Sequence, residues 1–67
     1  VDRGRFVANS HVASFSIGEY QGSLAARGMN RHGKLIDMFG APHGDETIDV
    51  MRAMAHIQWP NAKERRP

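Results

Sequence analysis

The stretch Ser16-Ile17-Gly18-Glu19, flanked by Phe15 and Tyr20, carries the strongest local folding signal in the chain. It has the S-x-x-E form of a capping box. In that motif the serine and glutamate side chains each accept a hydrogen bond from the backbone N–H of the other residue. Phe15 and Tyr20 occupy the two positions that pack as a hydrophobic staple. The stretch therefore predicts that a helix begins at Ile17, and it carries no information about chemistry.

The residues before this stretch indicate a strand. Residues 1–5 are a polar lead-in, and residues 6–15 have a strand-like pattern. Asn9-Ser10-His11 has turn chemistry, which allows a hairpin; a single strand over 11–15 is the alternative. An isolated hairpin is marginal in water, so either form needs a helix or a partner strand to pack on.

The residues after it read as helices. The segment 17–39 is either one helix or two, and we favour a break at Asn30-Arg31-His32-Gly33 because glycine and asparagine cluster there. Residues 40–44 form a loop, and Asp45-Glu46-Thr47 opens a last helix that ends at Trp59-Pro60. Residues 60–67 read as a flexible tail.

The expected fold is therefore mostly α. It is one small domain over residues 1–67, with a short N-terminal strand or hairpin followed by two or three helices. The expected core residues are mostly large and apolar: Phe15, Tyr20, Leu24, Leu35, Ile36, Phe39, Ile48, Met51, Met54, Ala55 and Trp59.

Composition limits the function classes. The chain has 67 residues and no cysteine, which excludes disulfides and thiolate zinc sites. Domains of this size are marginally stable and often need a partner. No segment is long and apolar enough for a membrane span or a signal peptide. The sequence does not determine the compartment, and we favour the cytoplasm.

No motif indicates catalysis or cofactor binding. The four histidines lack the i, i+4 spacing of a helical zinc site. No serine lies in a nucleophile-elbow pattern, and no glycine-rich loop has the P-loop form. We therefore expect that the protein is not an enzyme. We expect no catalytic residues, no metal site and no cofactor.

The preferred function is a non-enzymatic protein-interaction module, either a small homo-oligomer or an accessory subunit. The last helix has an apolar face too broad for so short a chain to cover, and we expect a protein partner or a second copy to bury it. The expected partner-binding residues lie on this helix: Ile48, Met51, Met54, Ala55 and Trp59.

The alternative is a dimeric DNA-binding regulator. A strand followed by two helices is the order of ribbon-helix-helix proteins, and the match is to that order only. Net charge is only +2, from nine Lys/Arg against seven Asp/Glu. The basic residues nevertheless fall in three clusters that contact phosphates if the fold brings them together. The clusters are Arg3 and Arg5; Arg27, Arg31, His32 and Lys34; and Lys63, Arg65 and Arg66. The residues expected to bind nucleic acid are Arg27, Arg31 and Lys34.

Overall fold

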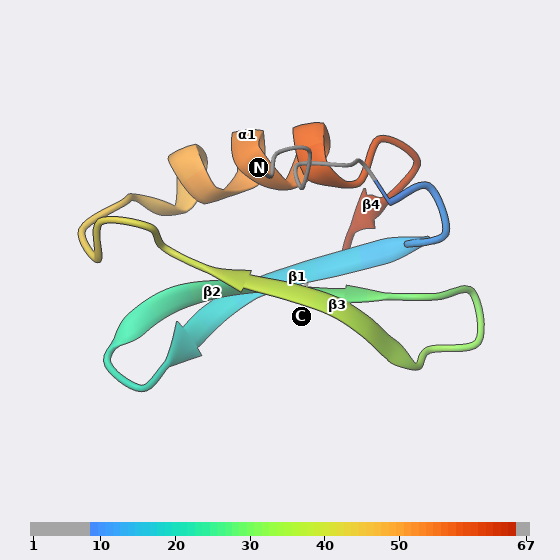
Figure 1. Cartoon of the computed structure of the whole chain (residues 1–67), viewed down its shortest axis with the longest axis horizontal. Coiled ribbons are helices and arrows are strands. Elements are labelled where there is room, and N and C mark those ends of the chain that lie inside the picture. Colours follow the sequence, from blue (N-terminus) through green and yellow to red (C-terminus); the bar gives the residue numbers. More distant parts are fainter. Residues whose placement is uncertain (1–8, 66–67) are drawn as a thin grey trace, which may run out of the picture.

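The computed structural model describes residues 9–65, which form a four-stranded sheet and one helix (Figure 1). The sheet order is β3-β2-β1-β4. The three long strands are antiparallel to one another, and the short β4 runs parallel to β1. The elements are β1 (Ser14–Tyr20), β2 (Ser23–Met29), β3 (Leu35–Gly40), α1 (Ile48–Gln58) and β4 (Lys63–Glu64).

The expectation of a mostly α fold, a small helical protein, is wrong, because the described chain is a sheet-rich α+β domain. Ser16-Ile17-Gly18-Glu19 lies inside β1. Side chains in this strand alternate, with Phe15 and Ile17 packed in the core. A capping box is worth about 1 kcal/mol, and burial of an apolar strand face against a helix outweighs that local preference.

Two tight turns explain why the segment 17–39 is not helical. Gln21 and Gly22 both have positive φ, 53° and 84°, as a two-residue hairpin turn between β1 and β2 requires. The second turn is at Asn30–Gly33, where the sequence predicts a break, and Gly33 has φ 84°. The break is thus confirmed in position, but it joins β2 to β3 rather than two helices.

The last helix is confirmed, although it begins at Ile48 rather than at Asp45. Thr47 is the N-cap, and its hydroxyl accepts a hydrogen bond from the N–H of Val50 at 3.2 Å. Of the predicted loop at 40–44, residue 40 ends β3 and residues 41–44 lie between β3 and this helix. Trp59 ends the helix directly before Pro60, as expected from the restricted backbone of a residue preceding proline.

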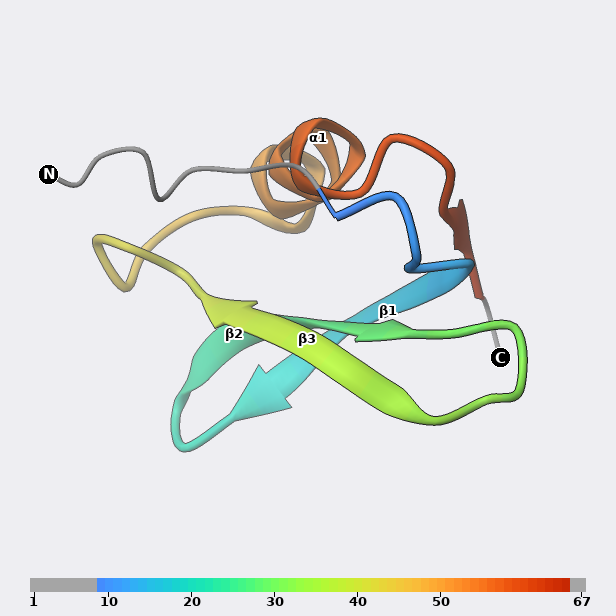
Figure 2. The same cartoon turned by 45° about the vertical axis from the view of Figure 1, so that its right-hand side comes forward.

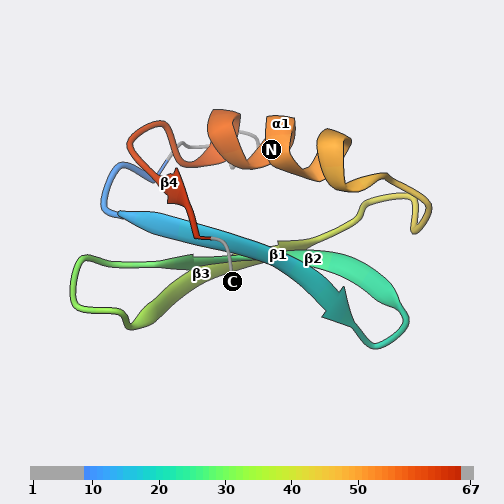
Figure 3. The same cartoon turned by 180° about the vertical axis from the view of Figure 1, so that it is seen from behind.

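The helix covers one face of the sheet and leaves the other face open (Figures 1, 2 and 3). The core between them consists of Val12, Phe15, Ala26, Met51, Ala55, Trp59 and Ala62. Of the predicted core, Phe15, Met51, Ala55 and Trp59 are buried, whereas Tyr20, Leu35, Ile36 and Ile48 are exposed. Residues expected to lie inside a helical bundle instead lie on a strand edge or on solvent-facing surfaces.

Gly28 allows the close packing of Trp59 on the sheet. A Cβ atom at position 28 would lie 3.0 Å from Trp59 Cε2 and 2.9 Å from Val12 Cγ1. The indole Nε1–H of Trp59 donates to Asp37 Oδ2 at 2.8 Å, so this buried donor has a partner. Trp59 therefore links the end of the helix to both β2 and β3.

The C-terminal segment differs from the expected flexible tail because part of it forms a strand. The lead-in 1–5 and one arm of the possible N-terminal hairpin lie outside the described residues. In the expected tail 60–67, Lys63–Glu64 forms β4. Glu64 Oε1 accepts from Arg52 Nε at 2.6 Å, which ties β4 to the helix, and this carboxylate raises the pKa of Arg52.

Candidate nucleic-acid interface

Strand alternation separates the charged side chains of the sheet by sign. Glu19 is paired with Leu24, Asp37 with Gly28, and Glu64 with Phe15. Each of these partners lies on the side of the sheet that faces the helix. Cross-strand partners share a face, so all three strand carboxylates of the described chain belong to the helix side.

The strand cations lie on the opposite, open face. Arg27 is paired with Ser16 and with Met38, and Lys63 is paired with Ser14. These positions alternate with the buried Phe15, Ala26 and Gly28, so their side chains project away from the helix. We call this surface the open face. It is lined by Ser14, Ser16, Gly18, Tyr20, Ser23, Ala25, Arg27, Met29, Met38, Gly40 and Lys63.

Arg27 lies near the middle of the open face and is oriented by an aromatic ring. Its guanidinium carbon is 5.6 Å from the centre of the Tyr20 ring, a cation–π distance. The Gly18–Ala25 row lies between the row of Arg27 and the row of Tyr20, so the Arg27 side chain extends along the open face to reach the ring. No ion pair involving Arg27 occurs within residues 9–65, so its hydrogen-bond donors are available to a ligand.

The β2–β3 turn holds further cations at one end of the sheet. The Asn30 side-chain oxygen accepts from the backbone N–H of His32 at 2.9 Å and of Lys34 at 3.0 Å. The Asn30 carbonyl also accepts from Gly33 N–H at 2.9 Å. These bonds fix the turn, and Arg31, His32 and Lys34 are all exposed on it.

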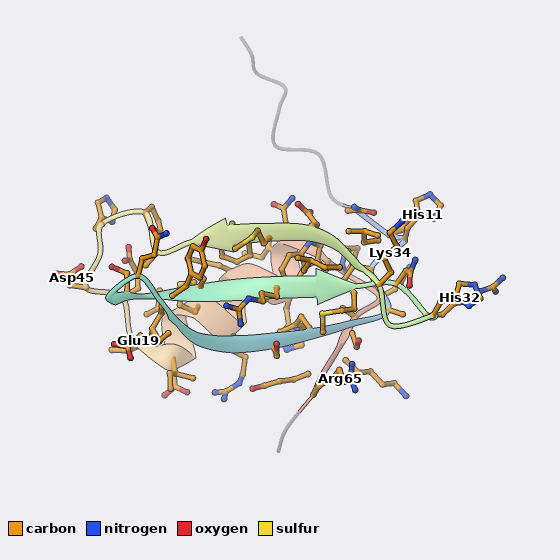
Figure 4. All side chains as sticks on the ribbon, turned by 90° about the horizontal axis from the view of Figure 1, so that it is seen from below. His11, Glu19, His32, Lys34, Asp45 and Arg65 are labelled. Atoms are coloured by element: carbon orange, nitrogen blue, oxygen red, sulfur yellow. The ribbon has the colours of Figure 1, made fainter. Side chains whose placement is uncertain are left out.

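The C-terminal segment brings a second group of cations to this end. Lys63 N–H donates to the Ala13 carbonyl at 3.1 Å, and Arg65 N–H donates to the Phe15 carbonyl at 2.7 Å. Arg65 lines one shallow depression together with Ser14, Arg31 and His32. We call Arg31, His32, Lys34 and Arg65 the basic end (Figure 4).

The opposite end of the molecule is acidic. Figure 4 shows Glu19 and Asp45 far from the labelled side chains of the basic end. In the same loop as Asp45, Glu46 accepts hydrogen bonds from the backbone N–H and the Nδ1 of His43, the latter at 2.9 Å. Burial favours the protonated form of Glu46, but these hydrogen bonds outweigh it and leave its pKa below the ordinary value. Charge is therefore polarised along the strands.

The three residues predicted to bind nucleic acid lie on one hairpin but not at one point, because the Arg27 side chain extends toward Tyr20 and away from the β2–β3 turn. Arg27, Arg31 and Lys34 all belong to the β2–β3 hairpin, with Arg27 on the open face and the other two in the turn. Arg65 of the C-terminal cluster lies beside Arg31 at the turn, and phosphate binding by these clusters stays a prediction. The N-terminal cluster, Arg3 and Arg5, lies outside the described residues.

The five predicted partner-binding residues do not form one surface. Met51, Ala55 and Trp59 are fully buried against the chain's own sheet. Ile48 is 48% exposed, and Met54 is partly buried beside the core. The apolar helix face is thus covered from within, because a sheet that the sequence analysis did not anticipate packs on it. Partner binding through Ile48 and Met54 stays a prediction.

Sequence reasoning missed Tyr20 and the serines of the open face as site residues. The signal that indicates them is the period-two alternation of residues 14–20, in which Ser14, Ser16 and Gly18 alternate with Phe15 and Ile17. A helix reading hides that alternation, since it places these residues on several sides of a cylinder.

Other site types find no support within residues 9–65. No three histidine or carboxylate side chains there lie close enough to hold a metal ion. The helix in this part of the chain is too short and too polar to cross a membrane. No protein-family model matches the chain, and neither a curated protein nor a solved structure matches it.

Proposed function

We propose that this domain binds double-stranded DNA by inserting the open face of its sheet, where the three long strands β1, β2 and β3 lie side by side, into the major groove. The observation that carries the proposal is the separation of charge by strand alternation. Arg27 and Lys63 project from the open face, whereas Glu19, Asp37 and Glu64 belong to the helix side. A polyanion approaching the open face therefore meets cations and hydroxyls without a strand carboxylate among the described residues.

The dimensions of the sheet suit B-form DNA. Neighbouring strands are about 4.8 Å apart, so three strands span about 10 Å, against a major groove about 12 Å wide. The major groove of A-form RNA is too narrow for side chains to read, which favours DNA over double-stranded RNA. Strands that read bases in a groove are an established mode of DNA recognition.

The side chains of the open face divide into two roles. Arg27 is the long donor-bearing residue at its centre, and arginine binds the O6 and N7 atoms of guanine in bidentate fashion. Met29 and Met38 supply apolar contacts suited to the thymine methyl group. Arg31, Lys34, Lys63 and Arg65 lie toward one end, where they contact phosphates that flank the groove.

The sheet that carries the open face forms within a single chain and does not require a dimer. In the ribbon-helix-helix expectation the reading strand pairs with a mate, but here β1 is paired on both sides within one chain. The order strand-helix-helix is absent from residues 9–65, which contain a single helix. We therefore propose DNA binding without a ribbon-helix-helix dimer. In this proposal the open face of a sheet formed within one chain contacts the DNA.

Salt dependence of DNA binding tests the proposal. Fluorescence anisotropy with a labelled duplex of mixed sequence is measured between 50 and 300 mM salt. Four phosphate contacts give a slope of log K against log salt of about −3.5. Replacing Arg31 and Arg65 with Ala should reduce the slope by about 1.8. No binding at low salt, or a slope unchanged in this variant, contradicts the proposal.

A matched control separates the open face from total charge. Val50→Glu lowers the net charge by one on the exposed surface of α1, on the far side of the sheet. It should weaken binding much less than Arg27→Ala, which makes the same charge change on the open face. On a duplex selected for tight binding, Arg27→Ala should cost about 1–3 kcal/mol at the base it reads.

A protein-interaction module is the second candidate function. The observation that favours it is the exposure of large apolar side chains along β3 and α1, including Leu35, Ile36, Met38 and Ile57. Unlike the expected helix face, these residues remain uncovered by the described chain. Monitoring sedimentation of the isolated chain through Trp59 tests this candidate, and a monomer at all concentrations argues against self-association.

A further inference from the structure

β3 is an edge strand of the sheet formed by residues 9–65, and its outer side carries backbone groups without a strand neighbour among those residues. Ala41 N–H donates to the Leu24 carbonyl of β2 at 3.0 Å. Alternate residues of an antiparallel strand bond to the same neighbour, so Phe39 and Asp37 also face β2. Met38 and Gly40 therefore direct their N–H and C=O groups away from the sheet.

The hydrogen bond of Met38 agrees with this assignment. Its N–H donates to the Asp37 carboxylate at 3.0 Å rather than to β2. The Asp37 side chain is itself held by the Trp59 indole, so it covers this one donor and does not extend along the edge. The carbonyl of Met38 and both backbone groups of Gly40 have no strand partner within the described chain.

The edge is also apolar. Leu35 is 48% exposed and Met38 is 40% exposed on the strand itself. Beside it, Met38, Phe39, Pro42, Met54 and Ile57 line a groove of about 350 Å³ between β3 and α1. Ile57 is 63% exposed at this groove. An edge strand with exposed apolar side chains and open backbone groups is a template for pairing with another strand.

The charges at the two ends of β3 indicate which strand can pair with its open edge. β3 begins next to the basic end, at Arg31 and Lys34, and leads at its other end to the loop that carries Asp45. A second copy of β3, laid antiparallel, reverses this direction. It places the acidic loop of each copy beside the basic end of the other, so the molecule is complementary to itself along this edge.

We propose that two copies of this chain form a symmetric dimer through antiparallel pairing of their β3 strands, centred on Met38. Each Met38 N–H exchanges its Asp37 carboxylate for the Met38 carbonyl of the second copy. The same register sets Ile36 opposite Gly40 and carries Arg31 toward Asp45 of the second copy. Both helices then lie on one side of a continuous sheet, and the two grooves meet. This dimer does not depend on the proposed DNA binding.

Sedimentation equilibrium without DNA tests the dimer, with Met38→Pro as the decisive variant. Proline removes the N–H that points off the edge and leaves the β2–β3 hydrogen bonds intact, so the fold tolerates it. Met38→Ala is the matched control, because it shortens the side chain and keeps the N–H. We expect a dimer for the unmodified chain, a weaker dimer for Met38→Ala and a monomer for Met38→Pro with an unchanged circular dichroism spectrum.

Charge reversal gives a second test that does not depend on how well proline is tolerated. Arg31→Asp and Asp45→Arg should each weaken the dimer, by about tenfold for two reversed pairs, and the double variant should restore it. An unmodified chain that stays monomeric to millimolar concentration overturns the proposal. So does a dimer that persists in folded Met38→Pro, or a double variant that fails to recover.

Discussion

Replacing Gly28 and Gly18 separately with alanine gives opposite results if the sheet is correct. Both residues lie within strands, and neither has positive φ, so alanine fits the backbone at both positions. At Gly28 the added Cβ meets Val12 at 2.9 Å and Trp59 at 3.0 Å. At Gly18 it meets nothing within 4 Å, because this residue is on the open face.

The size of each effect follows from these contacts. Val12 and Trp59 are both fully buried, so neither side chain moves without disturbing the core. Overpacking of this kind costs about 1–3 kcal/mol, offset by about 0.5 kcal/mol from the reduced freedom of the unfolded chain. We expect Gly28→Ala to lower Tm by about 2–20 °C and Gly18→Ala to raise it by about 2–4 °C.

Thermal unfolding followed by circular dichroism measures both variants, and urea unfolding checks the sign at 25 °C. The pair also discriminates between folds. If residues 17–39 formed a helix, each substitution would stabilise it by about 1 kcal/mol, because alanine is the better helix former. A Gly28→Ala protein as stable as the unmodified chain would refute the packing of Trp59 on β2.

Two further substitutions test side-chain hydrogen bonds, one between β3 and Trp59 and one within the loop before α1. Asp37→Ala leaves the buried Trp59 indole without its acceptor, and urea unfolding should show a loss of about 1–3 kcal/mol, whereas Asp37→Asn should lose less. The lowered pKa of Glu46 contributes stability at neutral pH that is lost as pH falls from about 4.5 through its lower folded value. The free energy of unfolding, measured from pH 7 to pH 3, should therefore decline less steeply in Glu46→Gln than in the unmodified chain. An identical decline in the two proteins would show that the Glu46–His43 contact does not contribute to the loss of stability in acid.

The helix α1 and the loop before it could be predicted from the sequence, to within three residues at the helix start, because their signals are local. Thr47 caps its own helix, and Pro60 restricts the residue directly before it. The turn at Asn30–Gly33 could also be located, since asparagine and glycine favour turns in either a helical or a sheet context. The three basic clusters were visible in the chain before any fold was known.

The identity of the elements between those signals was decided by tertiary structure. Ser16-Ile17-Gly18-Glu19 satisfies a helix start locally, but Phe15 and Ile17 gain more by packing on Met51 and Ala55 from a strand. That gain depends on residues more than thirty positions away, which a local pattern does not register. The same pairing moved Arg27 to the open face and enclosed Trp59. The sequence alone thus determined which residues carry charge, and only the sheet register decided that the strand cations and strand carboxylates face opposite sides.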